Sequence, residues 1–370
     1  MRSVAVCGEA IEAGLPYVDV LERIDFQGES LRVALVRSTD PVFEPDSAEH
    51  AEHVLVRVRA FSCNYRDRAI LARARAAGGM NSVFPFGSEF AGEVEAVGRG
   101  IDDLRAGDRV MADGSWPSAI DGVPDGLPTN SASKERLVVP RAKLFEIPAE
   151  MSDEVAASFQ IGGQTSYGMV RRLGLRASDK VWVTAARSNT SLFAIRAALN
   201  AGARVWVSTT SDHNHEELRA LGVEDVLKID TSSAADPSEP LLQLGRQIGG
   251  FDAVIDPLSD LHLDRAAEVL GNEGRYVTCG LYAQGQPTRP SSARPLDLQD
   301  VLTKTVVKTL HLLGNCLGTT EDLRRAVADH VDGQLDVTVD SVFEGERIRA
   351  FFERTYLAPD RFGKVVFRYS

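Results

Sequence analysis

The sequence has little cysteine, and its four cysteines are far apart in a chain of 370 residues. Cys7, Cys63, Cys279 and Cys316 include no C-x-x-C pair. This spacing supports neither a disulfide framework nor a four-cysteine zinc site. The simplest interpretation is a reduced, cytoplasmic protein.

Long hydrophobic runs and an excess of positive charge are also missing. No run of about 18 apolar residues occurs, so we expect no membrane-spanning helix. The chain has 53 acidic and 41 basic residues, a formal net charge of −12, which makes it a poor candidate for binding the phosphate backbone of nucleic acids. We therefore expect a small-molecule substrate, no nucleic-acid partner and no membrane association.

The chain is too long for one ordinary core and predicts two domains. Residues 1–150 are rich in short strand patterns, such as the alternating HVLVRVRA at 53–60. Strands and helices alternate over residues 151–314, which predicts a doubly wound parallel sheet covered by helices on both faces. The final KVVFRY segment reads as a strand that returns to the first domain. We therefore predict an α/β protein in which residues of about 315–370 complete domain 1–150.

Glycine is missing from the one turn where it is most expected. Residues 181–211 have the rhythm of strand, turn, helix and strand, yet the turn reads AARSNTS. Glycines in a Rossmann turn allow a tight bend, close approach of pyrophosphate and helix–strand packing. The matching positions are about Ala185, Ser188 and Ser191, which are all small. No proline removes the N–H groups at the start of the helix, so an anion site remains possible.

The polar side chains of this turn are candidate cofactor ligands. Hydroxyl and amide groups of Ser188, Asn189, Thr190 and Ser191 are suited to phosphate oxygens, and Arg187 adds a positive charge for a pyrophosphate. The alternative is that Ser188 or Asn189 only caps the helix while Arg187 points to solvent.

The end of the next strand bears on the choice between NAD and NADP. An acidic residue there would bind the ribose hydroxyls of NAD, but the segment reads STTS over 208–211 and no acid occurs before Asp212. Hydroxyl groups of Thr209 and Ser211 suit a 2′-phosphate, although both could be ordinary loop residues. We predict NADPH as the cofactor.

Several motifs in order support a family resemblance. They are NYRD at 64–67, GSEFAG at 87–92, AGDRV at 106–110, QTSY at 164–167, LGV at 221–223 and RFGKVV at 361–366. With the turn described above, they resemble the medium-chain dehydrogenase/reductase superfamily, in its zinc-free quinone oxidoreductase and enoyl reductase branch. The GSEFAG segment is especially similar to enoyl reductase domains of polyketide synthases. The resemblance implies a GroES-like domain at 1–150 and a Rossmann-like domain at 151–314.

The resemblance also implies that no metal is bound. Zinc-dependent members use Cys, His and Cys or Asp at three positions, which fall by alignment on Asn64, Ser88 and about Ile161. None of these is a good zinc ligand. Hydride transfer to a conjugated acceptor needs only a bound nicotinamide, a positioned substrate and a proton donor.

Two residues are the predicted catalytic groups. The resemblance places Asn64 near the nicotinamide, and Tyr65 could donate a proton or orient a substrate oxygen; the alternative is a packed tyrosine. Further predicted cofactor contacts are Thr165, Gly280, Leu281, Asn315 and Lys364, with a surface charge as the alternative for Lys364. Gly280 and Leu281 follow a strand of the parallel sheet at its carboxyl end, where ligands bind. Loops at 70–84 and 282–296 are expected to line the substrate pocket.

The function predicted from the sequence is a metal-free, NADPH-dependent reductase acting on a conjugated C=C or a quinone. The alternative keeps the fold but has a degenerate cofactor site, in a non-redox biosynthetic enzyme or in a scaffold or partner subunit. A third possibility is an enzyme of imine reduction or cyclisation. Relatives commonly pair through the edge of the parallel sheet, so we expect a homodimer, with residues 275–280 as the edge strand.

Overall fold

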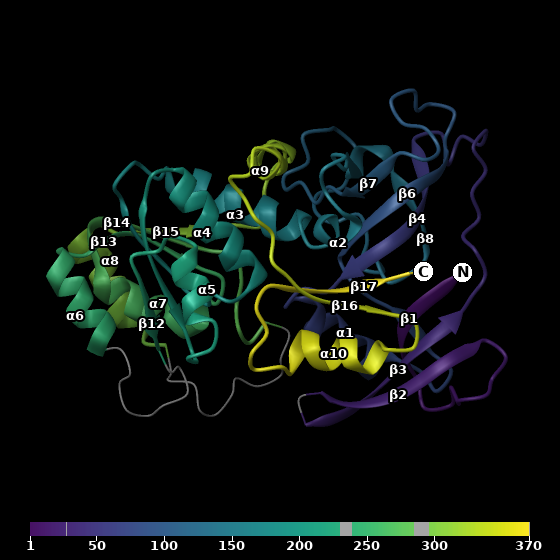
Figure 1. Cartoon of the computed structure of the whole chain (residues 1–370), viewed down its shortest axis with the longest axis horizontal. Helices are drawn as coiled ribbons and strands as arrows, with labels where there is room; N and C mark the ends of the chain where they lie inside the picture. The colour runs from purple at the N-terminus through teal and green to yellow at the C-terminus, as the bar shows by residue number, and fades with distance from the viewer. Residues whose placement is uncertain (27, 230–238, 285–295, 370) are drawn as a thin grey trace. The chain divides into compact units, whose positions relative to one another are not determined.

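A computed structural model describes residues 1–26, 28–229, 239–284 and 296–369 (Figure 1). The chain folds into two compact units. The first unit comprises Met1–Gln160 and Thr338–Ser370, and the second comprises Ile161–Val337. Within the described residues, no helix is both long and apolar enough to cross a membrane.

The first unit is built on two sheets. A four-stranded sheet has the order β2 (Val18–Phe26), β3 (Glu29–Arg37), β1 (Arg2–Cys7), β5 (Val83–Pro85). A seven-stranded sheet has the order β16 (Val339–Glu344), β17 (Lys364–Arg368), β4 (His53–Ser62), β6 (Glu89–Val97), β7 (Arg109–Ala112), β9 (Leu144–Glu146), with β8 (Arg136–Pro140) paired to β4. The helices of this unit are α1 (Asp67–Ala77), η1 (Arg141–Lys143), α2 (Asp153–Ala156) and α10 (Ile348–Tyr356).

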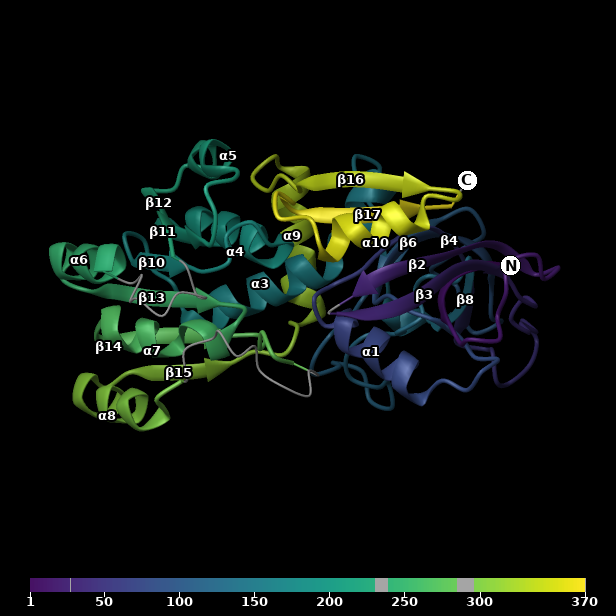
Figure 2. The ribbon, with the colours of Figure 1, turned by 90° about the horizontal axis from the view of Figure 1, so that it is seen from below.

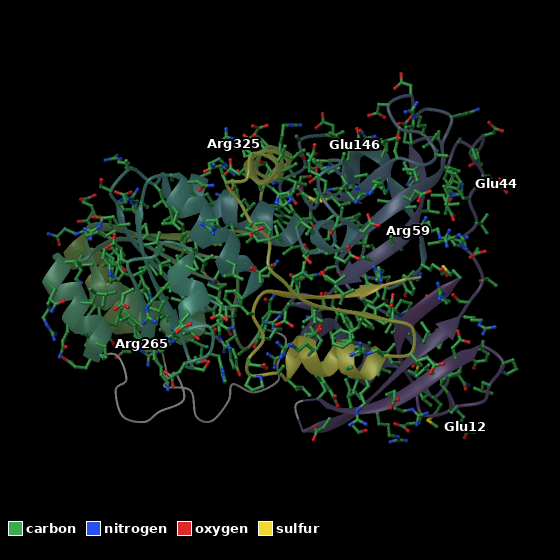
Figure 3. The ribbon with its side chains drawn as sticks, in the orientation of Figure 1. Glu12, Glu44, Arg59, Glu146, Arg265 and Arg325 are labelled. Carbon is green, nitrogen blue, oxygen red and sulfur yellow. The ribbon has the colours of Figure 1, made fainter. Side chains whose placement is uncertain are left out.

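Strand β4 shows why the first unit folds as it does. Its alternation places Val54, Val56 and Val58 fully in the core, and the residues between them are less buried. Strand β17 comes from the far end of the chain and pairs antiparallel with β4. Figure 2 shows β17 beside β16 and near α10. Glu12 and Glu44 of this unit are exposed (Figure 3).

Residues 70–84 were expected to form a loop. The first part of this segment, up to Ala77, instead belongs to helix α1. The alanine- and arginine-rich segment has high helix propensity, and its Leu71 is fully buried in the core. Most of the second expected loop, residues 285–295, lies outside the described residues.

The second unit contains one parallel sheet. Its order is β12 (Asp225–Lys228), β11 (Arg204–Thr209), β10 (Lys180–Val183), β13 (Phe251–Asp256), β14 (Leu270–Thr278), β15 (His311–Gly314). The helices are α3 (Gln160–Leu173), α4 (Asn189–Asn200), α5 (His215–Ala220), α6 (Glu239–Ile248), α7 (Ser259–Val269), α8 (Leu298–Lys308) and α9 (Thr320–Val331). Strands β10 and β13 are buried along nearly their whole length, as expected when helices cover both faces.

Two details of the second unit correct the sequence analysis. Helix α9 belongs to this unit, whereas residues from about 315 onward were assigned to the first domain. It is fixed to α3 because Arg171 Nε donates to Asp322 Oδ1 at 2.8 Å and Tyr167 Oη donates to Asp329 Oδ2 at 2.5 Å. Strand β14 is not at the edge of the sheet, because the short strand β15 pairs with it over Arg275–Thr278.

Candidate functional site

Strand pairing in the first unit brings together three polar residues from distant parts of the chain. Ser62 of β4 lies opposite Glu89 of β6 and opposite Val366 of β17. This register places Lys364, at the start of β17, next to Glu89 and to Asn64, which follows β4. Lys364 Nζ donates to Glu89 Oε2 at 2.5 Å and to Asn64 Oδ1 at 2.6 Å.

The amide of Asn64 is held on both sides. Its Nδ2 donates to Glu89 Oε2 at 2.7 Å and to Ser88 Oγ at 3.3 Å, while its Oδ1 accepts from Lys364. An amide nitrogen has two hydrogens, so both are used within this cluster. The remaining hydrogen-bonding capacity of the amide is a second acceptor position on Oδ1. This arrangement suits an orienting residue better than a proton donor.

A buried carboxylate supports the turn that carries the predicted catalytic residues. Asp67 Oδ2 accepts from the backbone N–H of Asn64 at 2.7 Å and from Ser88 Oγ at 2.8 Å. Its Oδ1 lies 3.6 Å from Arg66 Nη1. Burial raises the pKa of Asp67. Asp67 therefore fixes the backbone of Asn64 and the start of α1.

Tyr65 is half-buried, and its ring faces a cation. The guanidinium carbon of Arg68 lies 4.5 Å from the centre of the tyrosine ring. This distance is typical of a cation–π contact. The sequence analysis did not single out Arg68, which lies in the first turn of helix α1, three residues after Tyr65.

The residues at the expected zinc positions do not suit zinc. Asn64 offers an amide and Ser88 a hydroxyl, while Zn²⁺ prefers thiolate, imidazole or carboxylate. Glu89 is a suitable ligand type, but it is ion-paired with Lys364. Cys63 is buried, and burial raises the pKa of its thiol, which disfavours the thiolate that a metal needs. Within the described residues, no group of three or more His, Cys, Asp or Glu side chains is placed to hold a metal.

The glycine-free turn of the second unit keeps a conformation that favours glycine. Ala185 has a φ of 49°, in the left-handed region. Its carbonyl accepts from the N–H of Ser188 at 2.9 Å, and the N–H of Ala186 donates to the carbonyl of Ser208 at 2.9 Å. The tight bend is therefore formed without glycine and is fastened to the end of β11.

The serine hydroxyls of this turn bond to the turn itself. Ser188 is the N-cap of α4, and its Oγ accepts from the N–H of Ser191 at 3.2 Å. The two hydroxyl oxygens lie 2.9 Å apart, and Ser191 Oγ also donates to the carbonyl of Thr184 at 2.7 Å. These contacts favour the capping alternative for Ser188. Phosphate recognition would then rely on backbone N–H groups at the start of a helix of 12 residues.

Asn189 and Thr190 lie against helix α3. A methyl group on Gly162 would come within 2.8 Å of Asn189 Nδ2 and 2.7 Å of Phe193. Ser166 Oγ donates to the carbonyl of Thr190 at 2.8 Å. Glycine is therefore required on α3, rather than in the turn, for close helix packing at this place.

The side chain of Arg187, a residue of the turn after β10, contacts the end of β11. Its Nε donates to Thr209 Oγ1 at 3.2 Å, and the N–H of Ser211 donates to the same oxygen at 3.4 Å. The structure thus brings Arg187, Thr209 and Ser211 together, whereas the sequence analysis grouped Arg187 with the pyrophosphate.

A buried acid beneath the turn escaped the sequence analysis. Asp256, at the end of β13, accepts from Thr184 Oγ1 at 2.6 Å and from Tyr276 Oη at 2.7 Å. Burial, reinforced by Asp256, raises the pKa of Tyr276 well above its usual value. The pairing of neighbouring parallel strands was the available signal, because β10 and β13 end side by side.

Thr165 and Asn315, two predicted cofactor contacts, lie next to each other. The side-chain amide of Asn315 is hydrogen-bonded to other protein groups. Asn315 Nδ2 donates to the carbonyls of Thr165 at 3.3 Å and Leu317 at 2.6 Å, and its Oδ1 accepts from Arg172 Nε at 2.9 Å. Both Thr165 and Asn315 are buried.

Gly280 and Leu281 follow β14, as expected. The carbonyl of Gly280 accepts from the N–H and hydroxyl of Ser259 at 3.1 and 3.0 Å. Leu281 is exposed.

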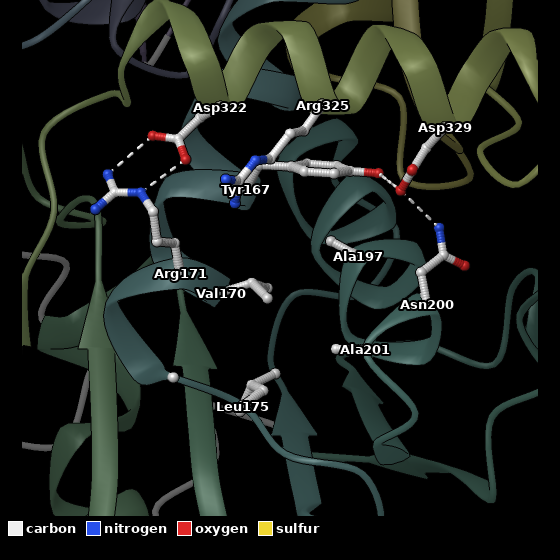
Figure 4. Close-up of a pocket in the computed structure, with 11 residues that line it drawn as sticks. Tyr167, Val170, Arg171, Leu175, Ala197, Asn200, Ala201, Asp322, Arg325 and Asp329 are labelled. Atoms are coloured by element: carbon white, nitrogen blue, oxygen red, sulfur yellow. Dashed lines mark hydrogen bonds and ion pairs between the residues drawn. The ribbon is translucent and has the colours of Figure 1, made fainter.

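A separate pocket of about 380 Å³ lies among α3, α4 and α9 (Figure 4). Asp329 accepts there from Tyr167 Oη at 2.5 Å and from Asn200 Nδ2 at 2.9 Å. Asn200 is the last residue of α4, while the glycine-free turn precedes its first residue. The pocket is therefore distinct from the candidate nucleotide site.

Two family models match the chain. The alcohol dehydrogenase GroES-like domain matches residues 50–149, and the zinc-binding dehydrogenase model matches residues 190–348. The chain belongs to the medium-chain dehydrogenase/reductase superfamily. The family and fold class predicted from the sequence are confirmed. Members of this superfamily are typically oxidoreductases that use a nicotinamide cofactor.

Curated relatives of this medium-chain dehydrogenase/reductase include polyketide synthases. Polyketide synthase GfsB of Streptomyces halstedii is 30% identical over 246 residues, which cover 65% of this chain and 4% of that protein. Erythronolide synthase EryA2 of Saccharopolyspora erythraea is 29% identical over 65% of this chain and 6% of its own length. The chain thus matches a small part of each synthase. A zinc-type alcohol dehydrogenase-like protein of Schizosaccharomyces pombe is 25% identical over 85% of this chain and 90% of its own length.

Solved structures share the fold. An NAD-dependent alcohol dehydrogenase superimposes with a TM-score of 0.74 at 22% identity, covering all of both chains. The quinone oxidoreductase from Coxiella burnetii gives a TM-score of 0.69 at 19% identity, covering 100% of this chain and 99% of the other. At these identities the likeness concerns the fold.

Proposed function

We propose that this protein is a metal-free reductase that transfers hydride from NADPH to a C=C bond conjugated to a carbonyl, or to a quinone. The observation that carries the proposal is the contact of Lys364 with Glu89 and Asn64 in the first unit. A lysine ammonium already neutralises Glu89, a carboxylate of this cluster that could otherwise bind zinc. A divalent cation placed beside it would be repelled by a like charge in a poorly solvated environment.

The second unit supplies the features that suit the nucleotide. NADPH, when bound, supplies the hydride. The turn retains its tight bend through Ala185, and the N-terminus of α4 offers N–H groups for the pyrophosphate. The end of β11 carries Thr209 in place of the acid of an NAD site. The first acid beyond it, Asp212, forms an ion pair with Lys228 at 2.5 Å. These features favour NADPH over NADH.

The first unit supplies groups for the substrate. Tyr65 is half-buried, which supports a role for its phenol as the donor of a proton or a hydrogen bond to a substrate oxygen. Asn64 is oriented rigidly by Lys364 and Glu89. The similarity to polyketide synthases supports an unsaturated acyl compound as the substrate.

A homodimer formed along β15 completes the proposal. Strand β15 is at the edge of the parallel sheet, and exposed apolar side chains gather on it and on α8. They are Leu298, Leu302, Val306, Val307 and Leu312. A second copy of this chain would cover an apolar surface that continues the sheet. We also propose a cytoplasmic location, since all four cysteines lie within the described residues and none of them forms a disulfide.

One observation favours a second candidate function. The hydroxyls of Ser188 and Ser191 are bonded to each other and to the turn, as in a turn kept for structure alone. A medium-chain reductase-like protein with a degenerate cofactor site would then act as a non-redox biosynthetic enzyme, a scaffold or a partner subunit.

Calorimetric titration of the full chain with NADPH and NADH tests the proposal. We expect micromolar NADPH binding, followed by NADPH oxidation in the presence of enones or quinones. Prior treatment with a zinc chelator should leave that activity unchanged. Absence of binding at millimolar nucleotide would overturn the reductase proposal and favour the second candidate. Loss of activity on chelation, restored by zinc, would contradict its metal-free character.

A further inference from the structure

Arg187 is attached to the strand that follows it, and this position bears on cofactor choice. Strands β10 and β11 are parallel neighbours, with Val183 opposite Val207. The N–H of Ala186 then donates to the carbonyl of Ser208, and Arg187 Nε donates to Thr209 Oγ1. Two successive residues of the turn are therefore bonded to two successive residues at the end of β11.

This attachment separates Arg187 from the start of α4. In a dinucleotide site, the pyrophosphate lies on the helix N-terminus, whereas the adenosine ribose lies at the end of the second strand. Arg187 is hydrogen-bonded at the end of the second strand, β11. Its side chain is therefore on the ribose side of the site.

The groups around Arg187 suit a phosphate. Thr209 contributes a hydroxyl, and the Oγ atom of Ser211 is buried without a hydrogen-bond partner among the described residues. His215 Nε2 lies 3.0 Å from the carbonyl oxygen of Ser211, which fixes the loop. The carboxylate of Asp212 is paired with Lys228. A guanidinium has five N–H donors in a planar fork that matches phosphate oxygens.

We infer that Arg187 binds the 2′-phosphate of NADPH and sets the preference for NADPH over NADH, with the hydroxyl of Ser211 as a second ligand. The inference rests on the proposed function, in which the second unit binds a nicotinamide dinucleotide. The charge that selects the phosphate thus comes from the glycine-free turn itself. The same turn that lacks glycine therefore also supplies the side chain that selects NADPH.

Binding measurements on two variants of the full chain test this role. Arg187→Ala should weaken NADPH binding about 10- to 100-fold, the range of one or two charge-assisted hydrogen bonds. NADH binding should change less than about threefold, because NADH has no 2′-phosphate. Arg187→Lys should lie between the wild type and Arg187→Ala, since an ammonium keeps the charge but loses the planar fork. Calorimetry with 2′,5′-ADP and 5′-ADP gives the same comparison without turnover, and only 2′,5′-ADP should lose affinity.

Arg204→Ala is the matched control. Arg204 lies at the opposite end of β11, is exposed and pairs with Glu224 at 3.0 Å. Its removal deletes a charge of the same sign at the far end of the strand that Arg187 contacts, and should leave the NADPH-to-NADH preference unchanged.

The outcomes separate this inference from the proposed function. Equal weakening of NADPH and NADH by Arg187→Ala would assign Arg187 to the pyrophosphate or to the shape of the turn, and would overturn the inference while the reductase proposal stands. Unchanged binding of both would overturn it as well. Failure of the wild-type chain to bind either nucleotide would overturn the proposed function, and the inference with it.

Discussion

The ammonium nitrogen of Lys364 lies 2.5 Å from Oε2 of Glu89, and the two side chains are 2% and 0% exposed. Both charges have lost nearly all contact with water, which is costly unless each has a partner. Asn64 adds a hydrogen bond to each of them. The pair is therefore stable as a unit, and neither charge is tolerated alone.

Replacing Lys364 with methionine should destabilise the first unit by about 3–5 kcal/mol, because the carboxylate of Glu89 stays buried without a counter-charge. Hydrogen–deuterium exchange of β4 and β6 amides, measured against denaturant concentration, reports this free energy. The double variant Lys364→Met/Glu89→Gln should recover part of the loss. Arg204→Met, which breaks an exposed pair, should change stability only slightly. A Lys364→Met effect as small as that of Arg204→Met would contradict the buried pair.

Replacing Ala185 with glycine should stabilise the second unit by about 0.5–1 kcal/mol. The left-handed conformation costs a non-glycine residue about 1–2 kcal/mol, and the flexibility of glycine in the unfolded chain offsets about 0.5–1 kcal/mol of the relief. Differential scanning calorimetry measures the change. Ala201→Gly is the matched control, because Ala201 has a φ of −75° at the other end of α4. It should destabilise by about 0.5–1 kcal/mol, and a loss of stability in Ala185→Gly as well would rule out strain at Ala185.

Replacing Val306 with lysine should weaken the proposed homodimer by at least tenfold, since a charge would be buried in an apolar interface. Val306 is 81% exposed in the single chain, so its folding should be unaffected. Sedimentation velocity over a range of protein concentrations measures the association. Val42→Lys makes the same change at a residue that is 74% exposed in the first unit, and should leave association intact. A wild-type chain that stays monomeric, or equal effects of both variants, would contradict an interface along α8 and β15.

The phenol of Tyr167 should make the stability of the second unit depend on alkaline pH. Burial and the hydrogen bond to Asp329 raise the pKa of Tyr167, while an unfolded tyrosine titrates near about 10. Its contribution is complete below that pH and is lost as the pH rises, because the unfolded state releases the proton first.

Tyr167→Phe should therefore destabilise by about 1 kcal/mol at neutral pH, and the difference from wild type should shrink between about pH 9 and 11. Urea unfolding at a series of pH values measures it. Tyr17→Phe, at an exposed tyrosine, serves as the control and should leave the profile unchanged. A difference that stays constant with pH would exclude this role for Tyr167.

The sequence predicted the parts of the fold that depend on local periodicity. Burial determines the alternation in β4 and the apolar runs in β10 and β13. Each of these patterns can be recognised from a few consecutive residues. Strand β15 was missed because four residues carry too little pattern. Helix α9 was misassigned because its attachment depends on side chains such as Arg171 and Asp322, which are far apart in the sequence.

The candidate site was harder to predict from the sequence, because its contacts also join residues that are far apart in the chain. The hydrogen bond between Lys364 and Asn64 spans 300 residues, so only the pairing of β17 with β4 reveals it. The bond from Arg187 to Thr209 depends on a side-chain direction that the turn sequence does not encode by itself. Motifs indicated which residues to examine, and the strand register determined which of them meet.

The position of β17 has a consequence for the synthesis of the protein. Lys364 follows Glu89 by 275 residues, so at common rates of translation about 14–55 s pass before the ammonium exists to meet the carboxylate. All of the second unit is made in that interval and can fold first. During that time β4 lacks the strand that covers one of its edges, and a nascent first unit is open to chaperones. A ribosome that stalls before β17 is complete would therefore leave a finished second unit attached to an unfinished first unit.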